Sequence, residues 1–576
     1  MTGVIRLSLR AARDIKHHTR AAMPQETGGI LVGHYDNQDI VVEQVIVVPP
    51  ELGEPANYTR NGPRAQTALN SISNKTLGYV GEWHSHPQTA GPSPIDRKSL
   101  AKITRRNGDF TGLVVHAPDE SFWGLVGSPT RFRTKIEEVE VRSLLKDIRQ
   151  QLGPLPGRAI DPDGPVFISY RHSDGSERAD SIETLLHAAG LVVWRDIRDV
   201  RPGTIEDRLE VALSDGLSAA VLIVTADVRR SNVIREREAP RLVELDEHNN
   251  FSLAIANEIP SPHTAGEPDY GIADRILGFA PDAVLGQKKQ VFSRLLNDRL
   301  VIVNDLVRHR LEVRRSKPAA SQKMLDIAVQ TRPPASAHDR YTGADLNIRA
   351  NSDDSSRKGL SLVSRLALKS TLPIVGDAAF SVAPKGISIR GGAHLSASIA
   401  LGATFPPTRF EPVVITDHRG QAWRSDHAGP RPSLLETPGP DSRRPGGPIA
   451  IGLFMAPAAD TDAFADLVET LRVGYSKSFQ IEGSDFMDPS SGAETARYLA
   501  ESIKQLAREC DTQDVHLAFQ GPFGLAVLLG RLLNTVRTHV YEFEDSGHRA
   551  EYELMFTLQL GRPDSPIVYV PGEPKR

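Results

Sequence analysis

The sequence is poor in cysteine, in net charge and in long apolar runs. Its 576 residues include one cysteine, Cys510, which excludes an intrachain disulfide framework and fits a reducing compartment. The formal net charge is −4, so we expect no general attraction to long nucleic acid or to a membrane surface. No apolar run approaches the roughly 18–20 residues of a membrane helix, and the basic N-terminal stretch lacks the apolar segment of a signal peptide. These absences predict a cytoplasmic protein.

A chain of this length exceeds what one hydrophobic core organises, so we expect roughly two to four domains. Clusters of proline and glycine mark the predicted breaks between them. The predicted segments are a first block at 1–150, a middle block at 160–260, a helical connector or linker at 261–339 and a last block at 340–576. The alternation of strand-like and helix-like segments predicts an α/β multidomain fold.

In the first block, two histidines stand two residues apart in the strand-like stretch GEWHSHP. Side chains at i and i+2 of a strand share one face, so His84 and His86 can bind the same metal ion. Asp96 follows in a loop, and two histidines with one carboxylate and an open fourth position are typical of a catalytic zinc site, where zinc lowers the pKa of bound water to about 7. Glu26 is a candidate general base, and Ser93 a candidate donor to an oxyanion. The alternative is a polar strand end with two surface histidines.

The segments ETGG, HSHP and SPID together resemble the JAB/MPN family of JAMM zinc isopeptidases, in which a distant Glu precedes His-x-His and Ser-x-x-Asp. The resemblance implies an α+β domain that binds Zn²⁺ and cleaves isopeptide bonds to ubiquitin-like tails. Its partner would be a conjugated cyclase or another ubiquitin-like conjugate. The loop between His86 and Ser93 is one residue shorter than is usual in the family. Processing of the chain itself, or docking without catalysis, are the alternatives.

In the middle block, the apolar segments VFISY, LVVWRD and AAVLIVT are predicted strands, and SIETLLHAAG and TIEDRLEVAL are predicted amphipathic helices. This alternation predicts a parallel sheet covered on both faces, whose sites lie at the carboxyl ends of the strands. Arg195 and Arg198 are expected on the solvated surface, and Trp194 has a second interpretation as a core residue. The candidate binding residues are Phe167, Ser169, Tyr170, Arg171, Trp194, Asp196 and Ser231.

The segments FISYRHSD, GLVVWRDIRDVRPG, AAVLIVTADV and SNVIREREAPRL resemble a TIR domain, which has a flavodoxin-like parallel sheet. Enzymatic TIR domains cleave the nicotinamide–ribose bond of NAD⁺ with one glutamate on the helix after the third strand. The resemblance therefore implies NAD⁺ as the substrate and Glu238 as the catalytic carboxylate. Glu236 is the alternative, because residues i and i+2 of a helix diverge by about 200°. Ile234 stands where the family often has tryptophan, and a TIR scaffold that only self-associates is the other interpretation.

In the last block, the segments 387–405 and 515–533 share one layout: a strand, a loop of small residues, and a helix with a leucine–glycine pair late in it. The pair Leu401–Gly402 matches Leu529–Gly530. We infer an internal duplication that gives two similar lobes. A loop at a helix N-terminus offers free N–H groups and a positive dipole end to anions, so two such loops predict a groove for a ligand with several phosphates. The alternative is a pair of tight turns without a ligand.

The segments HLSASIALGATFPP, VVITDHRGQAW and VHLAFQGPFGLAVLLGRLLN look like a SAVED domain, a fused pair of CARF-like Rossmannoid lobes that senses cyclic oligonucleotides in bacterial antiphage systems. Lys385 could neutralise a phosphate and Phe523 could stack on a base. By position, the resemblance implies ligand contacts from Lys385, His394, Ser396, Gly521, Pro522 and Phe523.

A JAB, TIR and SAVED order in one chain implies an antiphage effector of the CBASS type in a bacterial cytoplasm. A cyclic oligonucleotide would bind the SAVED lobes, drive a homo-oligomer or filament, and activate hydrolysis of NAD⁺ to nicotinamide and ADP-ribose, which stops growth as in abortive infection. One alternative is a signalling scaffold without NAD⁺ chemistry. Another is a TIR domain that releases a cyclised nucleotide.

Overall fold

The computed structural model describes most of the chain. The described residues are 3–36, 39–48, 62–70, 77–130, 133–195, 208–277, 279, 285–316, 323–332, 343–350, 359–382, 384–441, 446–457, 459–483, 486–545, 550–562 and 564–574. The chain divides into two compact units: the first comprises Met1–Leu155, Val224–Glu244 and Asn257–Gln290, and the second Pro156–Ile223, Leu245–Ala256 and Val291–Arg576. The middle block therefore contributes to both units. Within the described residues, no helix is long and apolar enough to cross a membrane.

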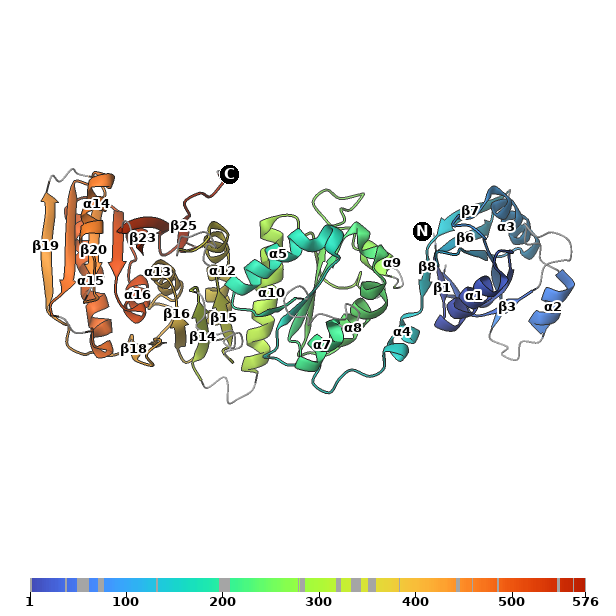
Figure 1. Cartoon of the computed structure of the whole chain (residues 1–576), viewed down its shortest axis with the longest axis horizontal. Helices are drawn as coiled ribbons and strands as arrows, with labels where there is room; N and C mark the ends of the chain where they lie inside the picture. Colours follow the sequence, from blue (N-terminus) through green and yellow to red (C-terminus); the bar gives the residue numbers. More distant parts are fainter. Residues whose placement is uncertain are drawn as a thin grey trace. The chain divides into compact units, whose positions relative to one another are not determined.

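The first block, blue in Figure 1, forms an eight-stranded mixed sheet. The strand order is β7-β6-β5-β4-β2-β3-β1-β8. β4 lies inside this sheet, antiparallel to β2 and parallel to β5, and the predicted strand before the two histidines is confirmed. The elements are β1 (Ile5–Leu7), α1 (Leu9–Ala22), β2 (Gly28–Asp36), β3 (Asp39–Val47), α2 (Gly62–Asn70), β4 (Gly78–Ser85), α3 (Pro94–Asn107), β5 (Thr111–His116), β6 (Phe122–Pro129), β7 (Thr134–Val139), β8 (Val141–Ser143) and α4 (Leu145–Leu152).

The middle block forms a five-stranded sheet in the order β10-β9-β11-β12-β13, with β9 parallel to both of its neighbours. This order is that of a flavodoxin-like sheet, which the resemblance to a TIR domain implies, and the parallel pairing of β9 agrees with the alternating pattern. The elements are β9 (Val166–Ser169), α5 (His172–Ala188), β10 (Val193–Trp194), α7 (Arg208–Asp215), β11 (Ala219–Val224), η1 (Ala226–Arg230), η2 (Ile234–Glu238), α8 (Ala239–Leu245), β12 (Ser252–Asn257), α9 (Ile272–Leu277) and β13 (Gln290–Val291).

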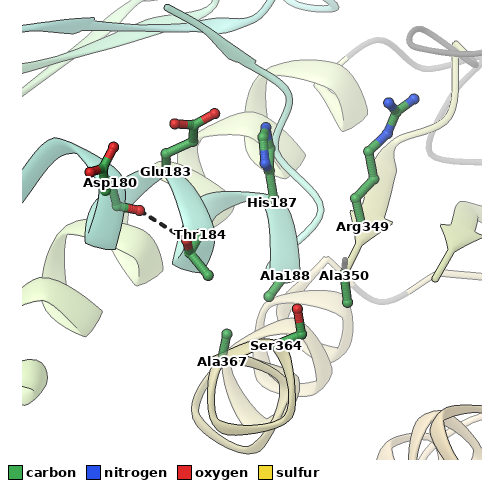
Figure 2. Close-up of a pocket in the computed structure, with 9 residues that line it drawn as sticks. All are labelled: Asp180, Glu183, Thr184, His187, Ala188, Arg349, Ala350, Ser364 and Ala367. Carbon is green, nitrogen blue, oxygen red and sulfur yellow. Dashed lines mark hydrogen bonds between the residues drawn. The ribbon is translucent and has the colours of Figure 1, made fainter. Parts of the chain in front are cut away.

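The predicted connector contains α10 (Leu296–Arg315), whose apolar residues belong to one continuous core that also includes α5, β9 and the last block. Arg310 of this helix is buried and donates to the carbonyls of Gly164 (2.7 Å) and Asp163 (3.0 Å). A small polar cavity of about 130 Å³ lies where α5 meets the first strands and helix of the last block (Figure 2). Figure 2 shows that Asp180, Glu183 and His187 line it from α5, opposite Arg349.

The last block contains two sheets with the same internal order, which confirms the predicted duplication. The first sheet runs β15-β14-β16-β17-β18, and the second contains β21-β20-β22-β23-β24 between the added edge strands β19 and β25. Within each matched set of five strands the final pair is antiparallel and the others are parallel. The added edge strands β19 and β25 pair antiparallel with β21 and β24.

The elements of the first lobe are β14 (Leu325–Gln330), β15 (Leu346–Arg349), α12 (Leu362–Ser381), β16 (Ile387–Gly392), α13 (Leu395–Thr404), β17 (Val413–Thr416) and β18 (Ala422–Arg424). Those of the second are β19 (Leu434–Asp441), β20 (Ile449–Phe454), α14 (Asp462–Leu471), β21 (Tyr475–Ile481), η4 (Pro489–Ser491), α15 (Gly492–Glu509), β22 (Asp514–Gln520), α16 (Phe523–Gly530), β23 (Arg537–Asp545), β24 (Ala550–Leu558) and β25 (Ile567–Tyr569).

The two lobes meet through the matched helices α13 and α16, at the glycines of the repeated leucine–glycine pairs. A Cβ added to Gly402 would lie 2.1 Å from the carbonyl oxygen of Val527, and one added to Gly530 would lie 2.1 Å from that of Ile399. Each glycine therefore packs against the backbone of the other helix. The contact lies one turn before the glycine of that helix, at Val527 and at Ile399. This reciprocity is what an internal two-fold relation between duplicated lobes produces.

Candidate functional site

The first block brings the three predicted metal ligands together. The distance from His84 Nε2 to His86 Nε2 is 3.2 Å, and Asp96 places Oδ1 at 3.3 Å from the first nitrogen and Oδ2 at 3.5 Å from the second. β4 carries His84, and the amide of His86 continues the strand pairing by donating to the carbonyl of His116 at 2.9 Å. The imidazoles thus come from a backbone that the sheet holds rigid.

Helix α3 delivers the carboxylate through a capping box. Ser93 is the N-cap residue, and its Oγ accepts from the amide of Asp96 at 3.2 Å. Asp96 Oδ2 in turn accepts from the amide of Ser93 at 2.6 Å. This reciprocal pair, together with proline at the first helical position, starts the helix and fixes the carboxylate next to the imidazoles. Ser93 therefore positions Asp96, a role that the Ser-x-x-Asp spacing of a capping box could have indicated.

The electrostatics of the cluster favour a cation among these groups. The hydrogen bond to Asp96 raises the pKa of His86, although burial alone would lower it. The negative charge of Glu26 also raises the pKa of His86. Burial alone would raise the pKa of Asp96, but hydrogen bonds from His84 and His86 lower it well below its usual range. The carboxylate is therefore ionised, as a metal ligand must be.

The donor atoms fit a tetrahedral zinc ion. Zinc bonds to nitrogen and oxygen of about 2.0–2.2 Å, at the tetrahedral angle, separate neighbouring donors by about 3.3–3.5 Å. The two imidazole nitrogens, 3.2 Å apart, are close to that separation. Asp96 offers a different oxygen to each of them, at 3.3 and 3.5 Å, and one ligand atom from each of the three residues lies within 4.8 Å of the others. His86 Nδ1 also lies 3.0 Å from the carbonyl of Ala90, which leaves Nε2 with its lone pair toward the ion. His84, His86 and Asp96 would therefore hold the metal.

Glu26 is placed beside the cluster by a short stretch of paired backbone. The amide of Ser85 donates to the carbonyl of Thr27 at 2.7 Å, and the amide of Thr27 donates to Ser85 Oγ at 3.0 Å. Gly28 then pairs with His84 in the sheet. Because Glu26 precedes this anchored segment, its carboxylate lies within electrostatic range of His86, as a general base next to the metal requires.

The predicted NAD⁺ residues fall into two groups that belong to different compact units. In the second unit, Phe167 and Trp194 pack with ring centroids 5.3 Å apart, and Trp194 is a core residue with 4% of its surface exposed. Ser169 is buried, and Arg171 is the N-cap of α5, where its Nε donates to Ser173 Oγ at 2.9 Å. Asp196 and Arg198 lie outside the described residues.

In the first unit, Ser231 ends η1, and its Oγ accepts from the amide of Ile234 at 3.4 Å. The two candidate carboxylates sit on the π-helical turn η2, where Glu238 is buried at 5% exposure and Glu236 is exposed. Their divergence agrees with the predicted helical geometry. A joint NAD⁺ site from these groups stays a prediction.

Arg195 corrects the expectation of a solvated surface residue. Only 3% of it is exposed, and its guanidinium folds back onto α5. It donates to Glu183 at 2.7 Å, to Asp180, and to the hydroxyl of Tyr170 at 3.0 and 3.1 Å. No local pattern indicates these contacts, because Glu183, Asp180 and Tyr170 lie 12, 15 and 25 positions before Arg195. The charged run after β10 looked like an ordinary exposed loop.

The structure separates Lys385 from the other predicted nucleotide contacts of the first lobe. Lys385 is exposed before β16, whereas His394 and Ser396 follow the carboxyl end of that strand. Six strand residues span about 20 Å. In the second lobe, Gly521 and the N-cap residue Pro522 precede α16, and Phe523 is 9% exposed, which leaves little ring surface for stacking.

The predicted anion site at α13 is filled by the chain itself. The amides of Leu395 and Ser396 donate to the carboxylate of Glu542 at 3.1 and 2.8 Å. His394, the N-cap residue, is held by Thr331, whose Oγ1 lies 2.8 Å from both the amide nitrogen and Nδ1. The carboxylate comes from the other lobe, so the free N–H groups expected from the sequence are occupied.

Comparison with known proteins assigns the two ends of the chain. Residues 8–132 match Prok-JAB, the prokaryotic homologues of the JAB domain, and residues 377–558 match SAVED, the SMODS-associated and fused to various effectors sensor domain. A CD-NTase/cGAS isopeptidase of Vibrio cholerae is 29% identical over 122 residues, which cover 20% of this chain and 72% of that protein. Neither matched range reaches 160–260, so the TIR assignment stays a prediction.

Two solved structures give looser likenesses. Protein DSY2949 from Desulfitobacterium hafniense is 21% identical, covers 24% of this chain and 94% of its own, and has a TM-score of 0.21. The Acinetobacter baumannii Cap4 SAVED/CARF-domain receptor with the cyclic trinucleotide 2'3'3'-cAAA is 12% identical, covers 76% of this chain and 92% of its own, and has a TM-score of 0.35. The two family matches show that the chain contains a Prok-JAB domain at residues 8–132 and a SAVED domain at residues 377–558.

Proposed function

We propose that the first block is a zinc-dependent isopeptidase. The observation that carries this proposal is the His84, His86 and Asp96 cluster, whose donor atoms lie close enough together to share one metal ion. The Vibrio cholerae relative is named as an isopeptidase that acts on a CD-NTase. By that relation the substrate is an isopeptide-linked conjugate of a nucleotide cyclase or of a ubiquitin-like protein.

The residues around the cluster have separate tasks. Zinc, when bound, supplies a Lewis acid for hydrolysis. The carboxylate of Glu26 accepts a proton from the attacking water and returns it to the leaving amine of the isopeptide bond. Ser93 keeps Asp96 in place through the capping box, and its hydroxyl is the candidate donor to an oxyanion.

The test of this activity is deconjugation by the purified full-length chain. A cyclase isolated as an isopeptide-linked conjugate is incubated with zinc-loaded protein, and release of the tail is followed by intact mass. We expect cleavage by the wild type and by His34→Ala, whose exposed histidine lies on the same sheet. Glu26→Gln should retain zinc and lose cleavage. Equal cleavage by Glu26→Gln and wild type would remove Glu26 from the mechanism.

We further propose that the SAVED domain senses a cyclic oligonucleotide in a CBASS-type defence response. The duplicated lobes, which present two matched strand-to-helix turns at one interface, support this function. The Cap4 receptor is described with a bound cyclic trinucleotide. Calorimetric titration of the full chain with a panel of cyclic di-, tri- and tetranucleotides is the direct test, and saturable binding of one member is the expected result. Heat changes indistinguishable from buffer across the panel would contradict it.

The middle block is the proposed output, a TIR domain that hydrolyses NAD⁺ when ligand drives assembly. The flavodoxin-like strand order and the buried Glu238 on a π-helical turn favour this interpretation, because π-helical turns are frequent at functional sites. NAD⁺ loss with and without the bound cyclic nucleotide is measured by chromatography. Glu238→Gln should abolish the loss, and the exposed Glu236→Gln should not. A non-catalytic signalling scaffold is the alternative, and it predicts growth arrest that survives Glu238→Gln.

A further inference from the structure

The N-terminus of helix α13 already binds an anion, the carboxylate of Glu542 from the opposite lobe. Glu542 follows the part of β23 that pairs with β22, is 3% exposed, and accepts from the first two amides of α13 at 3.1 and 2.8 Å. Arg332 adds a cation 3.8 Å from the carboxylate. Two amide donors, a helix dipole and a guanidinium are the groups that bind a phosphate oxygen equally well.

The same place contains a polar atom that the carboxylate does not satisfy. Ser396, whose amide donates to Glu542, is 1% exposed, and its Oγ has no hydrogen-bond partner among the described residues. A buried hydroxyl without a partner destabilises the protein, because it has lost its hydrogen bonds to water. A phosphate group offers more acceptor oxygens than a carboxylate and can accept from the hydroxyl as well as from the two amides. The site therefore suits a larger anion than the one it holds.

The duplicated lobe contains the matching carboxylate in a different state. Strand register makes Asp417 the counterpart of Glu542, because each follows the last residue that pairs its strand with β16 or β22. Asp417 does not bind the α16 end. It accepts from the Trp423 indole at 3.1 Å and from the amides of Arg419 and Gln421 at 2.9 and 3.0 Å.

Trp423 also covers the start of α16. A Cβ added to Gly524, the counterpart of Ser396, would lie 2.2 Å from Trp423 Cγ. Glu542 thus accepts hydrogen bonds from the N-terminus of α13. Its counterpart Asp417 accepts from the Trp423 indole instead of from the N-terminus of α16. The two lobes show that this register position accommodates both arrangements.

We propose that Glu542 is an internal competitor, which occupies the phosphate position of α13 in the unliganded protein and is displaced when the cyclic oligonucleotide binds. This inference rests on the sensor function proposed above. Because Glu542 belongs to one lobe and α13 to the other, its displacement breaks a link between the lobes at the moment of binding. Ligand affinity is therefore set partly by the hydrogen bonds that the carboxylate must give up.

The test compares affinities for the panel member that the wild type binds. Glu542→Gln keeps the side-chain shape but removes the charge, and Glu542→Asp keeps the charge but shortens the reach. We expect at least about tenfold tighter binding by Glu542→Gln and a smaller gain by Glu542→Asp. The matched control is Glu551→Gln, an exposed glutamate on β24, which should bind like the wild type.

The outcomes separate this inference from the sensor function. If the wild type binds a cyclic nucleotide and both folded Glu542 variants bind it equally or more weakly, the carboxylate is a structural cap and the inference is overturned while the sensor function stands. Tighter binding by Glu542→Gln than by both the wild type and Glu551→Gln supports the inference. If no protein binds any panel member, the sensor function fails and this inference falls with it. Hydrogen exchange at Leu395 and Ser396 in the wild type should change on ligand addition even if Glu542→Gln does not fold.

Discussion

The metal cluster of the first block and the end of α13 differ in how far apart along the chain their parts lie. His84 and His86 are two residues apart. Asp96 is held next to them by the capping box with Ser93, three residues before it. Ser396 and Glu542 are separated by 146 positions. In a site built from neighbouring residues, local backbone geometry keeps the side chains close. The contact between Glu542 and the N-terminus of α13 forms only when both lobes have folded and packed together. The first kind is visible as a motif, and the second is not.

The largest expected effect comes from breaking the local site. His84→Ala removes one of three ligands, so we expect zinc content to fall from one ion per chain to a trace, and isopeptidase activity to fall by about 10³-fold or more. Elemental analysis after dialysis and the deconjugation assay measure these changes. The thermal stability of the last block should not change, because the cluster is self-contained. Retention of zinc by His84→Ala would place the ion elsewhere.

A contact of intermediate separation is Arg195 with Glu183, 12 positions apart. Arg195→Met leaves a buried carboxylate without its cation, and we expect a loss of about 3 kcal/mol in the free energy of unfolding, measured by denaturant titration. The double variant Arg195→Met with Glu183→Leu should recover most of that loss, since no uncompensated charge remains. A change below about 0.5 kcal/mol in the single variant would return Arg195 to the solvated surface expected from the sequence.

The next prediction concerns the interface between the lobes, where α13 and α16 cross at Gly402 and Gly530. Gly530→Ala puts a Cβ about where the carbonyl of Ile399 lies, so the helices must separate, and we expect a loss of about 2–3 kcal/mol together with weaker ligand binding. Gly392→Ala is the control, because no atom lies within 4 Å of the Cβ it would add. Equal stability of the two variants would argue against the close crossing of α13 and α16.

The smallest expected effect is a pH dependence within the first block. Burial, and then the positive charge of Lys16, lower the pKa of His116 to about 4. The unfolded chain takes up this proton near pH 6.5 and the folded chain only near 4, so His116 stabilises the fold at neutral pH and that contribution is lost as the pH falls through this window. Between pH 6.5 and 5, His116→Gln should lose about 2 kcal/mol less than the wild type in thermal or denaturant unfolding. Parallel pH profiles of the two proteins would contradict the assignment.

The features that could be predicted from the sequence are those made by residues close together along the chain or by a repeated pattern. The spacing of His84, His86 and Asp96 predicted their shared site, because strand and cap geometry act over a few residues. The repeated leucine–glycine pairs predicted the two lobes, since Gly402 and Gly530 are needed where the helices touch. The alternation of strands and helices predicted a parallel sheet in the middle block, whereas its flavodoxin-like strand order was expected from the TIR resemblance.

The remaining features depend on contacts that no local pattern encodes. Arg195 was expected in solvent because its partners lie on another element, and Lys385 was grouped with His394 although a whole strand separates them. The occupation of α13 by Glu542 required the docked lobes. The helix end was recognisable from the sequence, but the side chain that fills it was not.

The most direct test of the central claim is X-ray absorption at the zinc edge of the purified full-length chain. We predict one zinc per chain with only nitrogen and oxygen neighbours at about 2.0–2.2 Å, two of them imidazoles, and loss of this signal in His84→Ala. Zinc bound through sulfur, or an unchanged spectrum in the variant, would show that the His84, His86 and Asp96 cluster is not the metal centre.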